Sequence, residues 1–263
     1  MRPEISNPFT DTSIFFTHRI MQIQINNLKK CFGEKVAVNI DSYTIHSGEM
    51  LGLVGNNGAG KSTLFRLMLD LIKADNGDVH MAGNFQETDV DVNVAETEQW
   101  KDWTGAYIDE SFLIDYLTPD EYFQFIARIS GISSDELKTF LDRFSHFMAD
   151  EVIGQKKLIR NLSAGNKQKV GIIAAMLLRP QVLILDEPFN FLDPSSQSAI
   201  KHLLTKYNQE TGATILISSH NLQHTVDICP RIALLEHGII IRDIDNRDGQ
   251  AQTELEDYFQ ITD

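Results

Sequence analysis

The stretch from residue 55 to 63 restricts the possible folds more than any other part of the chain. It follows an apolar run at 50–54, precedes apolar residues at helical spacing in 64–72, and reads Gly55-Asn56-Asn57-Gly58-Ala59-Gly60-Lys61-Ser62-Thr63. This pattern predicts a strand, a glycine-rich loop and a helix, an arrangement that binds phosphate groups through inward-pointing backbone N–H groups. We expect Lys61 to reach the outer phosphates of a nucleotide and the Ser62 hydroxyl to ligate Mg²⁺.

Length and charge narrow the classes of protein to consider. The chain has 263 residues, 42% of them apolar, which is enough for one large α/β domain or two small ones. Its formal net charge of −14 disfavours sequence-independent binding to nucleic acid or anionic lipid. Cys31 and Cys229 lie far apart without neighbouring His or Cys, so the sequence indicates neither a zinc site nor a disulfide framework. This cysteine usage suits a reducing cytosol.

The first 20 residues read as an N-terminal extension, and the main domain is expected at 21–263. The extension is polar and contains proline, and it lacks the continuous apolar core and cleavage site of a signal peptide. We assign it no function. No apolar run in the chain approaches the length that spans a bilayer.

Hydrophobic patterns predict alternating strands and helices. Strands are expected at 21–28, 36–45, 50–54, 79–84, 104–108, 182–185, 214–218, 232–235 and 239–241. Helices are expected at 64–72, 119–130, 133–149, 165–178, 194–207, 222–228 and 253–259. Polar turns are expected at 29–35 and 76–78, and 85–103 carries no clear pattern. The alternation predicts a parallel sheet around the phosphate loop, with the helices of 119–162 inserted as a subdomain.

Two carboxylates follow the apolar run Val182-Leu183-Ile184-Leu185. Ligands of parallel sheets bind at the carboxyl ends of the strands, so Asp186 is expected beside the phosphates, holding Mg²⁺ directly or through water. Glu187 is expected to orient and polarise the attacking water as general base. The alternative is a strand that simply ends at a charged turn.

The segment Asn161-Leu162-Ser163-Ala164-Gly165-Asn166-Lys167-Gln168 precedes an apolar helix. Ser163 can cap that helix, which is its commoner role. It can also belong to a second anion site, in which its hydroxyl and the following backbone N–H groups bind a γ-phosphate.

Taken together, these motifs resemble the ATP-binding subunit of ABC transporters over about residues 21–259. The resemblance rests on the order of the phosphate loop, a helical insert, Leu-Ser-x-Gly, Asp-Glu-Pro after an apolar strand, Leu-Asp-Pro, and Ser-His after another strand. It implies an α/β fold of the P-loop NTPase class, with a parallel-sheet core, an antiparallel β subdomain and a helical subdomain at about 109–165. Bacterial exporter-type members are the most similar.

The resemblance also implies roles for single residues. Two such domains pack head to tail, and ATP lies between the phosphate loop of one and the segment Ser163-Ala164-Gly165-Asn166 of the other. Phe32 would stack on adenine, or else be a surface aromatic of a hairpin. Asp193 would lie in the loop that crosses the dimer interface, and before Pro194 it also reads as a helix N-cap. His220 would contact the γ-phosphate, or else be a solvated strand-end histidine.

Three positions depart from the family pattern. Ala164 stands where a first glycine is usual, which matters little if the residue is helical and more if it needs positive φ. Asn166 replaces a common glutamine. Asp109, with Glu110 as the second choice, occupies the position of a glutamine that senses Mg²⁺ and the membrane partner. An acidic residue there could still hold a Mg²⁺-bound water, so Asp109 is expected at the metal site with Ser62 and Asp186.

We therefore expect an ATPase on the cytoplasmic face of the membrane that uses ATP and Mg²⁺ to drive a membrane-spanning partner on another chain. It would act as a homodimer or heterodimer of ATP-binding subunits. A soluble ABC-type ATPase acting on ribosomes or DNA, a P-loop kinase or GTPase, and a low-turnover regulatory subunit are the alternatives. The 112–131 stretch favours export by analogy, and the sequence does not indicate the cargo.

Overall fold

The computed structural model describes residues 21–148, 151–249 and 251–255. The expected extension at 1–20 lies outside this part. Of the helix expected at 253–259, the structure describes the beginning, as a helix over 251–255.

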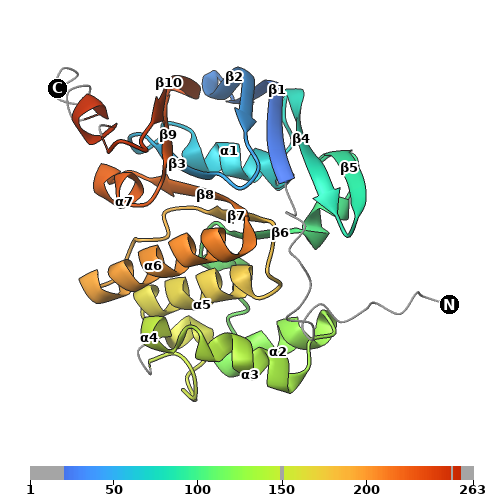
Figure 1. The fold of residues 1–263 in the computed structure, drawn as a ribbon, viewed down its shortest axis with the longest axis vertical. Coiled ribbons are helices and arrows are strands. Elements are labelled where there is room, and N and C mark those ends of the chain that lie inside the picture. Colours follow the sequence, from blue (N-terminus) through green and yellow to red (C-terminus); the bar gives the residue numbers. More distant parts are fainter. Residues whose placement is uncertain (1–20, 149–150, 250, 256–263) are drawn as a thin grey trace.

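A six-stranded sheet forms the centre of the molecule, and its five parallel strands bring their carboxyl ends to one edge (Figure 1). The strand order is β10-β9-β3-β8-β7-β6. The bounds are β3 (Met50–Val54), β6 (Thr104–Tyr107), β7 (Val182–Leu185), β8 (Thr214–Ser219), β9 (Arg231–Glu236) and β10 (Ile239–Asp245). Only β10 runs antiparallel, as the second strand of a hairpin with β9. The edge at the carboxyl ends is where the ligand site of such a sheet is expected.

A second, antiparallel sheet packs over one face of the central sheet. Its order is β2-β1-β4-β5, with β1 (Met21–Phe32), β2 (Lys35–Ile45), β4 (Asn76–Phe85) and β5 (Thr88–Asn93). Helix α1 (Lys61–Met68) lies between the two sheets, and its side chains Leu64, Phe65, Leu67 and Met68 join one buried cluster with both. The phosphate loop is thereby connected to a helix covered on two sides.

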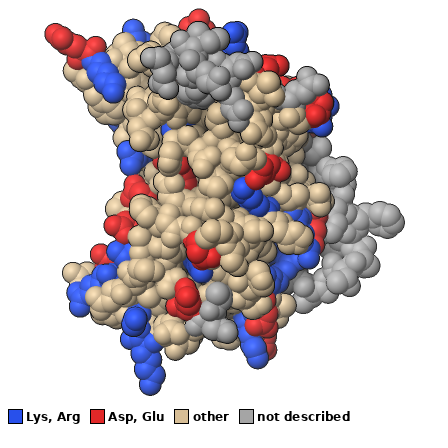
Figure 2. Space-filling view, turned by 90° about the vertical axis from the view of Figure 1, so that its left-hand side faces the viewer, with Lys and Arg blue, Asp and Glu red and all other residues tan. Residues whose placement is uncertain are grey.

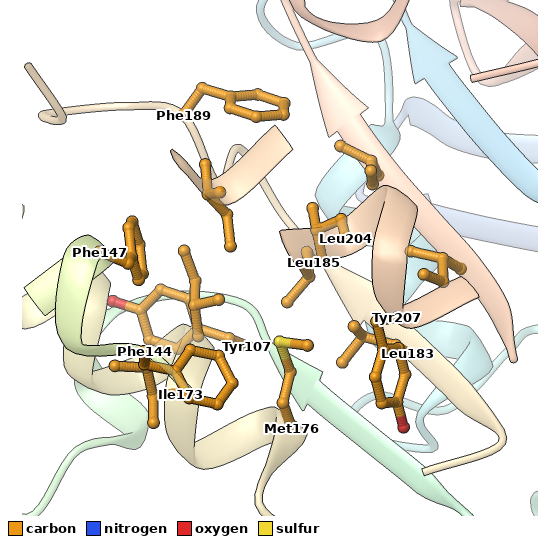
Figure 3. Packing of buried hydrophobic residues seen from close by; sticks show 14 of the residues in the cluster. Tyr107, Phe144, Phe147, Ile173, Met176, Leu183, Leu185, Phe189, Leu204 and Tyr207 are labelled. Atoms are coloured by element: carbon orange, nitrogen blue, oxygen red, sulfur yellow. The ribbon is translucent and has the colours of Figure 1, made fainter. Parts of the chain in front are cut away.

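Helices cover the opposite face of the central sheet (Figure 1). They are α2 (Pro119–Ile129), α3 (Ser134–Asp142), α4 (Ser145–Met148), α5 (Ala164–Met176) and α6 (Pro194–Thr211), with the short α7 (Leu222–Val226) beside β3 and β8. Successive side chains of a strand point to opposite faces of the sheet. Leu183 and Leu185 therefore pack with the helices, while Val182 and Ile184 face α1. Figure 3 shows this helix-side cluster, where Tyr107, Ile173 and Met176 meet.

Several predicted boundaries were wrong. The strand expected to end at residue 28 continues to Phe32, because its extra residues pair with β2, and the 29–35 turn shrinks to Gly33 and Glu34. Residues 76–78 begin β4, and the Asp75 N–H group donates to the Lys29 carbonyl at 2.8 Å. The single helix expected at 133–149 is two, α3 and α4. The unassigned 85–103 region contains β5 and the 3₁₀ turn η1 (Gln99–Asp102).

Candidate nucleotide-binding site

The phosphate loop leaves the carboxyl end of β3 and enters α1, as the sequence predicts. Two of its glycines are required by close backbone approach. A Cβ atom on Gly55 would lie 2.2 Å from the Leu235 carbonyl oxygen, and one on Gly60 would lie 2.3 Å from that of Ala37. Gly60 is the N-cap of α1 and provides no side-chain cap, so the first N–H groups of the helix stay available to an anion.

The ammonium group of Lys61 lies against the backbone of the phosphate loop. The side chain is buried, and Nζ donates to the carbonyl oxygens of Gly55 at 2.6 Å and Asn56 at 3.4 Å. Its nearest carboxylate oxygen, Glu187 Oε1, is 3.5 Å away. A buried ammonium group held this way at the mouth of an anion-binding loop is placed to bind phosphate oxygens.

A cavity of about 270 Å³ lies over this loop. It is lined by Phe32, Lys35, Ala37, residues 57–63 and Glu187. The Phe32 ring is 53% exposed, and Lys30 Nζ lies 5.5 Å from its centroid. An exposed aromatic that lines the same cavity as the phosphate loop provides a flat face for a nucleobase, which supports the stacking role over that of a plain surface residue.

Asp186 lies buried at the end of β7, beside the loop. Burial raises the pKa of its carboxyl, while hydrogen bonds from the Ser218 and Ser62 hydroxyl groups oppose the shift. The Asp186 carboxylate and the Ser62 hydroxyl thus lie together as hard oxygen donors of the kind that Mg²⁺ prefers, so the residues present fit a magnesium ion.

Glu187 is positioned by its neighbours. Its backbone has φ 48°, its N–H donates to Ser218 Oγ at 2.8 Å, and its carbonyl accepts from Gln168 Nε2 at 3.0 Å. The carboxylate accepts from the His220 backbone N–H at 3.2 Å and lies 2.8 Å from His220 Nδ1. The structure therefore brings Lys61, Glu187 and His220 together, as the sequence predicts.

Ser218 and Gln168 are supporting residues that the sequence analysis missed. Ser218 binds the Asp186 carboxylate and the Glu187 N–H group at once, so it fixes both acidic residues. The available signal was a serine directly after the short apolar run at 215–217 of β8. For Gln168, a buried polar side chain on α5, the sequence gives no comparable signal.

The segment of the second predicted anion site lies at the start of α5. Ser163 caps this helix, because its Oγ accepts from the Asn166 N–H at 3.2 Å, which confirms the capping role. Ala164 is the first helical residue, is exposed and is not at positive φ. Gly165 is more restricted, since its Cβ would lie 2.6 Å from the Phe191 carbonyl oxygen. None of the residues from 163 to 166 lines the cavity over the phosphate loop.

Asp193 and Asp109 both bind groups of their own chain. Asp193 is the N-cap of α6 and accepts from the Ser195 and Ser196 N–H groups at 2.9 and 3.0 Å. Asp109 is 3.0 Å from Arg66 Nη2. Burial alone would raise the pKa of Asp109, but the hydrogen bonds from Ser111 and Arg66 outweigh it and lower the pKa. The second choice for the Asp109 role, Glu110, pairs instead with Lys167 Nζ at 2.8 Å.

Comparison with known proteins agrees with this geometry. The family described as ABC transporter matches residues 38–190. The chain is 30% identical over 246 residues to the bacitracin transport ATP-binding protein BcrA of Enterococcus faecalis, covering 92% of this chain and 75% of that one. It is 31% identical over 219 residues to the linearmycin resistance ATP-binding protein LnrL of Bacillus subtilis, covering 83% of this chain and 68% of that one.

Solved structures share the fold. An ATP-binding subunit of an ABC transporter has a TM-score of 0.74 at 25% identity, covering 92% of this chain and 99% of that one. A dimeric ATP-binding cassette bound to ADP and Pi has a TM-score of 0.72 at 23% identity, covering 86% of this chain and 99% of that one. Across the described ranges, no helix is both long and apolar enough to cross a membrane. The predicted α/β fold of the P-loop NTPase class is confirmed, and the chain belongs to the ABC transporter family as an ATP-binding, ATP-hydrolysing subunit.

Proposed function

We propose that the chain hydrolyses ATP in a site that a second ATP-binding subunit completes, and that it thereby drives a membrane-spanning partner. The observation that carries this proposal is that Lys61 and Glu187 line one cavity with the phosphate loop and that His220 contacts the Glu187 carboxylate, while residues 163–166 do not line this cavity. One half of an ATP site is assembled, and the residues expected for the other half lie elsewhere on the chain.

The chemistry follows from the contacts of Glu187. Lys61 lies 3.5 Å from this carboxylate, and entering phosphate oxygens would draw the ammonium group toward themselves. His220 then remains as the partner of Glu187, at 2.8 Å, and holds the carboxylate for proton transfer from the attacking water. Mg²⁺, when held by Ser62 and Asp186, would neutralise phosphate charge. Phe32 would hold the adenine ring.

The second half-site would come from another copy of this chain or from a paralogous subunit. Ser163 and the N–H groups of Ala164, Gly165 and Asn166 begin α5, so a positive helix end points outward there. Because Ala164 is helical, its methyl group needs no unusual backbone conformation. This supports turnover over the low-turnover regulatory alternative.

The membrane partner is expected to dock beside Asp109. A cavity of about 230 Å³ there is lined in part by Leu69, Leu71, Trp100 and Phe112. Leu71 and Phe112 are 44% and 46% exposed, so covering them would be favourable. The loop is also tied to the catalytic strand, because the Asp186 N–H donates to the Tyr107 carbonyl at 2.9 Å.

The chain would thus work at the cytoplasmic face of the membrane, held there by its partner. The transport and resistance functions in the names of the two relatives support an exporter-type role. On the face in Figure 2, acidic and basic side chains are interspersed, which gives no support to a nucleic-acid-binding alternative.

The test is the Glu187→Gln variant, assayed for ATP turnover and for ATP binding. We expect turnover to fall at least about a hundredfold while binding persists, because the amide keeps the shape but cannot accept the proton. Lys61→Ala is expected to lose binding instead. Glu254→Gln, at an exposed position near the C-terminus, is the control and should match the parent. Unchanged turnover in Glu187→Gln would refute the base assignment.

A further inference from the structure

The two segments that carry Glu187 and His220 extend beyond the paired part of the central sheet. The ladder between β7 and β8 ends at the pair Leu185 and Ile217. Glu187 comes two residues after this pair and His220 three residues after it, so the ladder itself does not align them. Glu187 also has φ 48°, a conformation that a residue other than glycine keeps only where its surroundings hold it. The contact between the two side chains therefore depends on what fixes the two segments.

Two aromatic rings join these segments farther along the chain. Phe189 follows Glu187 by two residues, and the other ring belongs to His224 on α7. The two ring centroids lie 4.7 Å apart, and the ring planes are tilted by 34°. Aromatic rings at this separation attract each other. The ring pair is thus a second connection between the segments, in addition to the bonds that Ser218 makes.

Each ring is fixed on its own element. Phe189 is 2% exposed and belongs to the helix-side cluster, in which Figure 3 shows it. Its carbonyl oxygen accepts from the Gln197 side-chain amide of α6 at 3.2 Å. His224 lies on a helix that Asn221 caps and that contacts both β3 and β8. A displacement of one segment would therefore be resisted by the other.

Helix α6 is tied to the same place. Lys201 Nζ lies 5.7 Å from the centroid of the Phe189 ring. The same ammonium group is 2.5 Å from Oδ2 of Asp227, the C-cap residue of α7. One cation thus contacts the ring of one segment and the helix end of the other, so the two segments are joined at more than one point.

The His224 ring is suited to packing rather than to hydrogen bonding. Burial and the positive charge of Lys201 lower the pKa of its imidazole, so the ring is uncharged at neutral pH. Its Nδ1 atom is buried and has no hydrogen-bond partner among the described residues. The contact with Phe189 therefore accounts for this ring, and an apolar ring of similar shape should be able to replace it.

We propose that His224 is a positioning residue for ATP hydrolysis. By packing on Phe189, it holds the segment after β8 against the segment after β7 and keeps His220 Nδ1 2.8 Å from the Glu187 carboxylate. His224 does not line the cavity over the phosphate loop, so it acts through His220 and not on the nucleotide. The inference rests on the proposed function, in which Glu187 and His220 act on the attacking water.

The first test separates turnover from nucleotide binding. In His224→Ala we expect kcat for ATP to fall at least about fivefold, because small displacements of a reacting group are costly. The dissociation constant for ADP, which is not hydrolysed, should stay within about twofold of the parent. His224→Phe should retain most of the parental kcat. His202→Ala, which removes an exposed histidine of α6, is the matched control and should match the parent in both measurements.

The second test asks whether the two rings act as a pair. Phe189→Leu removes the ring and keeps an apolar side chain, so its kcat should also fall. The double variant of Phe189→Leu and His224→Ala should be no slower than the slower single variant, because either change already breaks the same contact. Phe189→Leu combined with His202→Ala should equal Phe189→Leu alone. Thermal unfolding checks that each variant is folded at the assay temperature.

Four results would overturn the positioning role of His224. They are a parental kcat in His224→Ala, a loss in His224→Phe as large as that in His224→Ala, multiplied losses in the double variant, and weaker ADP binding that matches the loss of kcat. If Glu187→Gln still loses turnover in that case, the proposed function stands without this inference. Unchanged turnover in Glu187→Gln would remove both.

Discussion

Ser218 is expected to be more important for stability than its small size suggests. Its hydroxyl, fully buried in β8, donates to the Asp186 carboxylate and accepts from the Glu187 N–H at 2.8 Å. Ser218→Ala leaves both groups without this partner. A hydrogen bond to a charged group contributes about 1.5–3 kcal/mol and a neutral one about 0.5–1.5 kcal/mol. The free energy of unfolding should therefore fall by about 2–4 kcal/mol, which lowers Tm by roughly 5–15 °C.

The free energy of unfolding that Ser218→Ala loses should depend on pH in a defined direction. Burial raises the pKa of Asp186 above its ordinary value, and the bond from Ser218 opposes that shift. A raised pKa means that the folded chain binds more protons than the unfolded chain, so this carboxyl lowers stability as pH rises through its folded pKa. Ser218→Ala raises the pKa further. The stability difference from the parent should be fully present near neutral pH and shrink as pH falls toward the unfolded pKa.

The assay is urea unfolding of the nucleotide-free, magnesium-free chain near neutral pH and at about pH 5. Ser219→Ala is the matched control, because Ser219 is also buried in β8 but its hydroxyl, among the described residues, bonds with Asn221 alone, at 2.9 and 3.0 Å. The free energy of unfolding that Ser219→Ala loses should be smaller and should not change with the charge of Asp186. The reasoning is refuted if the two serine variants lose the same stability, or if the difference between them grows on acidification.

Two further predictions concern the face that we propose meets a second subunit. Ala164→Gly should leave ATPase activity nearly unchanged, whereas Gly165→Ala should lower it several-fold. The added Cβ of Gly165→Ala would lie 2.6 Å from the Phe191 carbonyl oxygen and would force the loop to move. Equal effects of the two variants in a steady-state ATPase assay would contradict this. Asp193→Asn should destabilise the chain at neutral pH only. Hydrogen bonds from Ser196 lower the pKa of Asp193, so its contribution is present above the unfolded pKa and lost as pH falls; a pH-independent difference in Tm would disprove it.

The parts of the fold that were predictable are those defined by local pattern. The phosphate loop, α1 and β7 fall where the glycine spacing and apolar runs place them, within a few residues. The extension of β1 beyond residue 28 depends on pairing with β2 and on Lys29 bonding with Asp75. Such pairing is tertiary and leaves little local signal. The β4–β5 turn uses Gln86 and Glu87 at positive φ, where glycine or asparagine would have marked a turn.

The candidate site likewise has residues that the sequence predicts and contacts that it does not. Lys61, Asp186, Glu187 and His220 were predictable because each ends or follows a recognisable element. The bonds that orient them were not, since Ser218 on β8 meets residues more than thirty positions away only after the sheet forms. The Arg66–Asp109 ion pair likewise joins α1 to a loop 43 positions later. Residue type and spacing predicted the candidate reacting groups, and the fold supplies their orientation.

The burial of α1 between two sheets has a mechanical consequence. Because Leu64 and Phe65 are packed in a cluster that draws on both sheets, the helix cannot tilt without opening contacts on two sides at once. The position of the phosphate loop, which leads into α1, is thus fixed by this packing. Helices α2 and α3 belong to the other buried cluster, on the opposite face of the central sheet, so their packing does not involve α1.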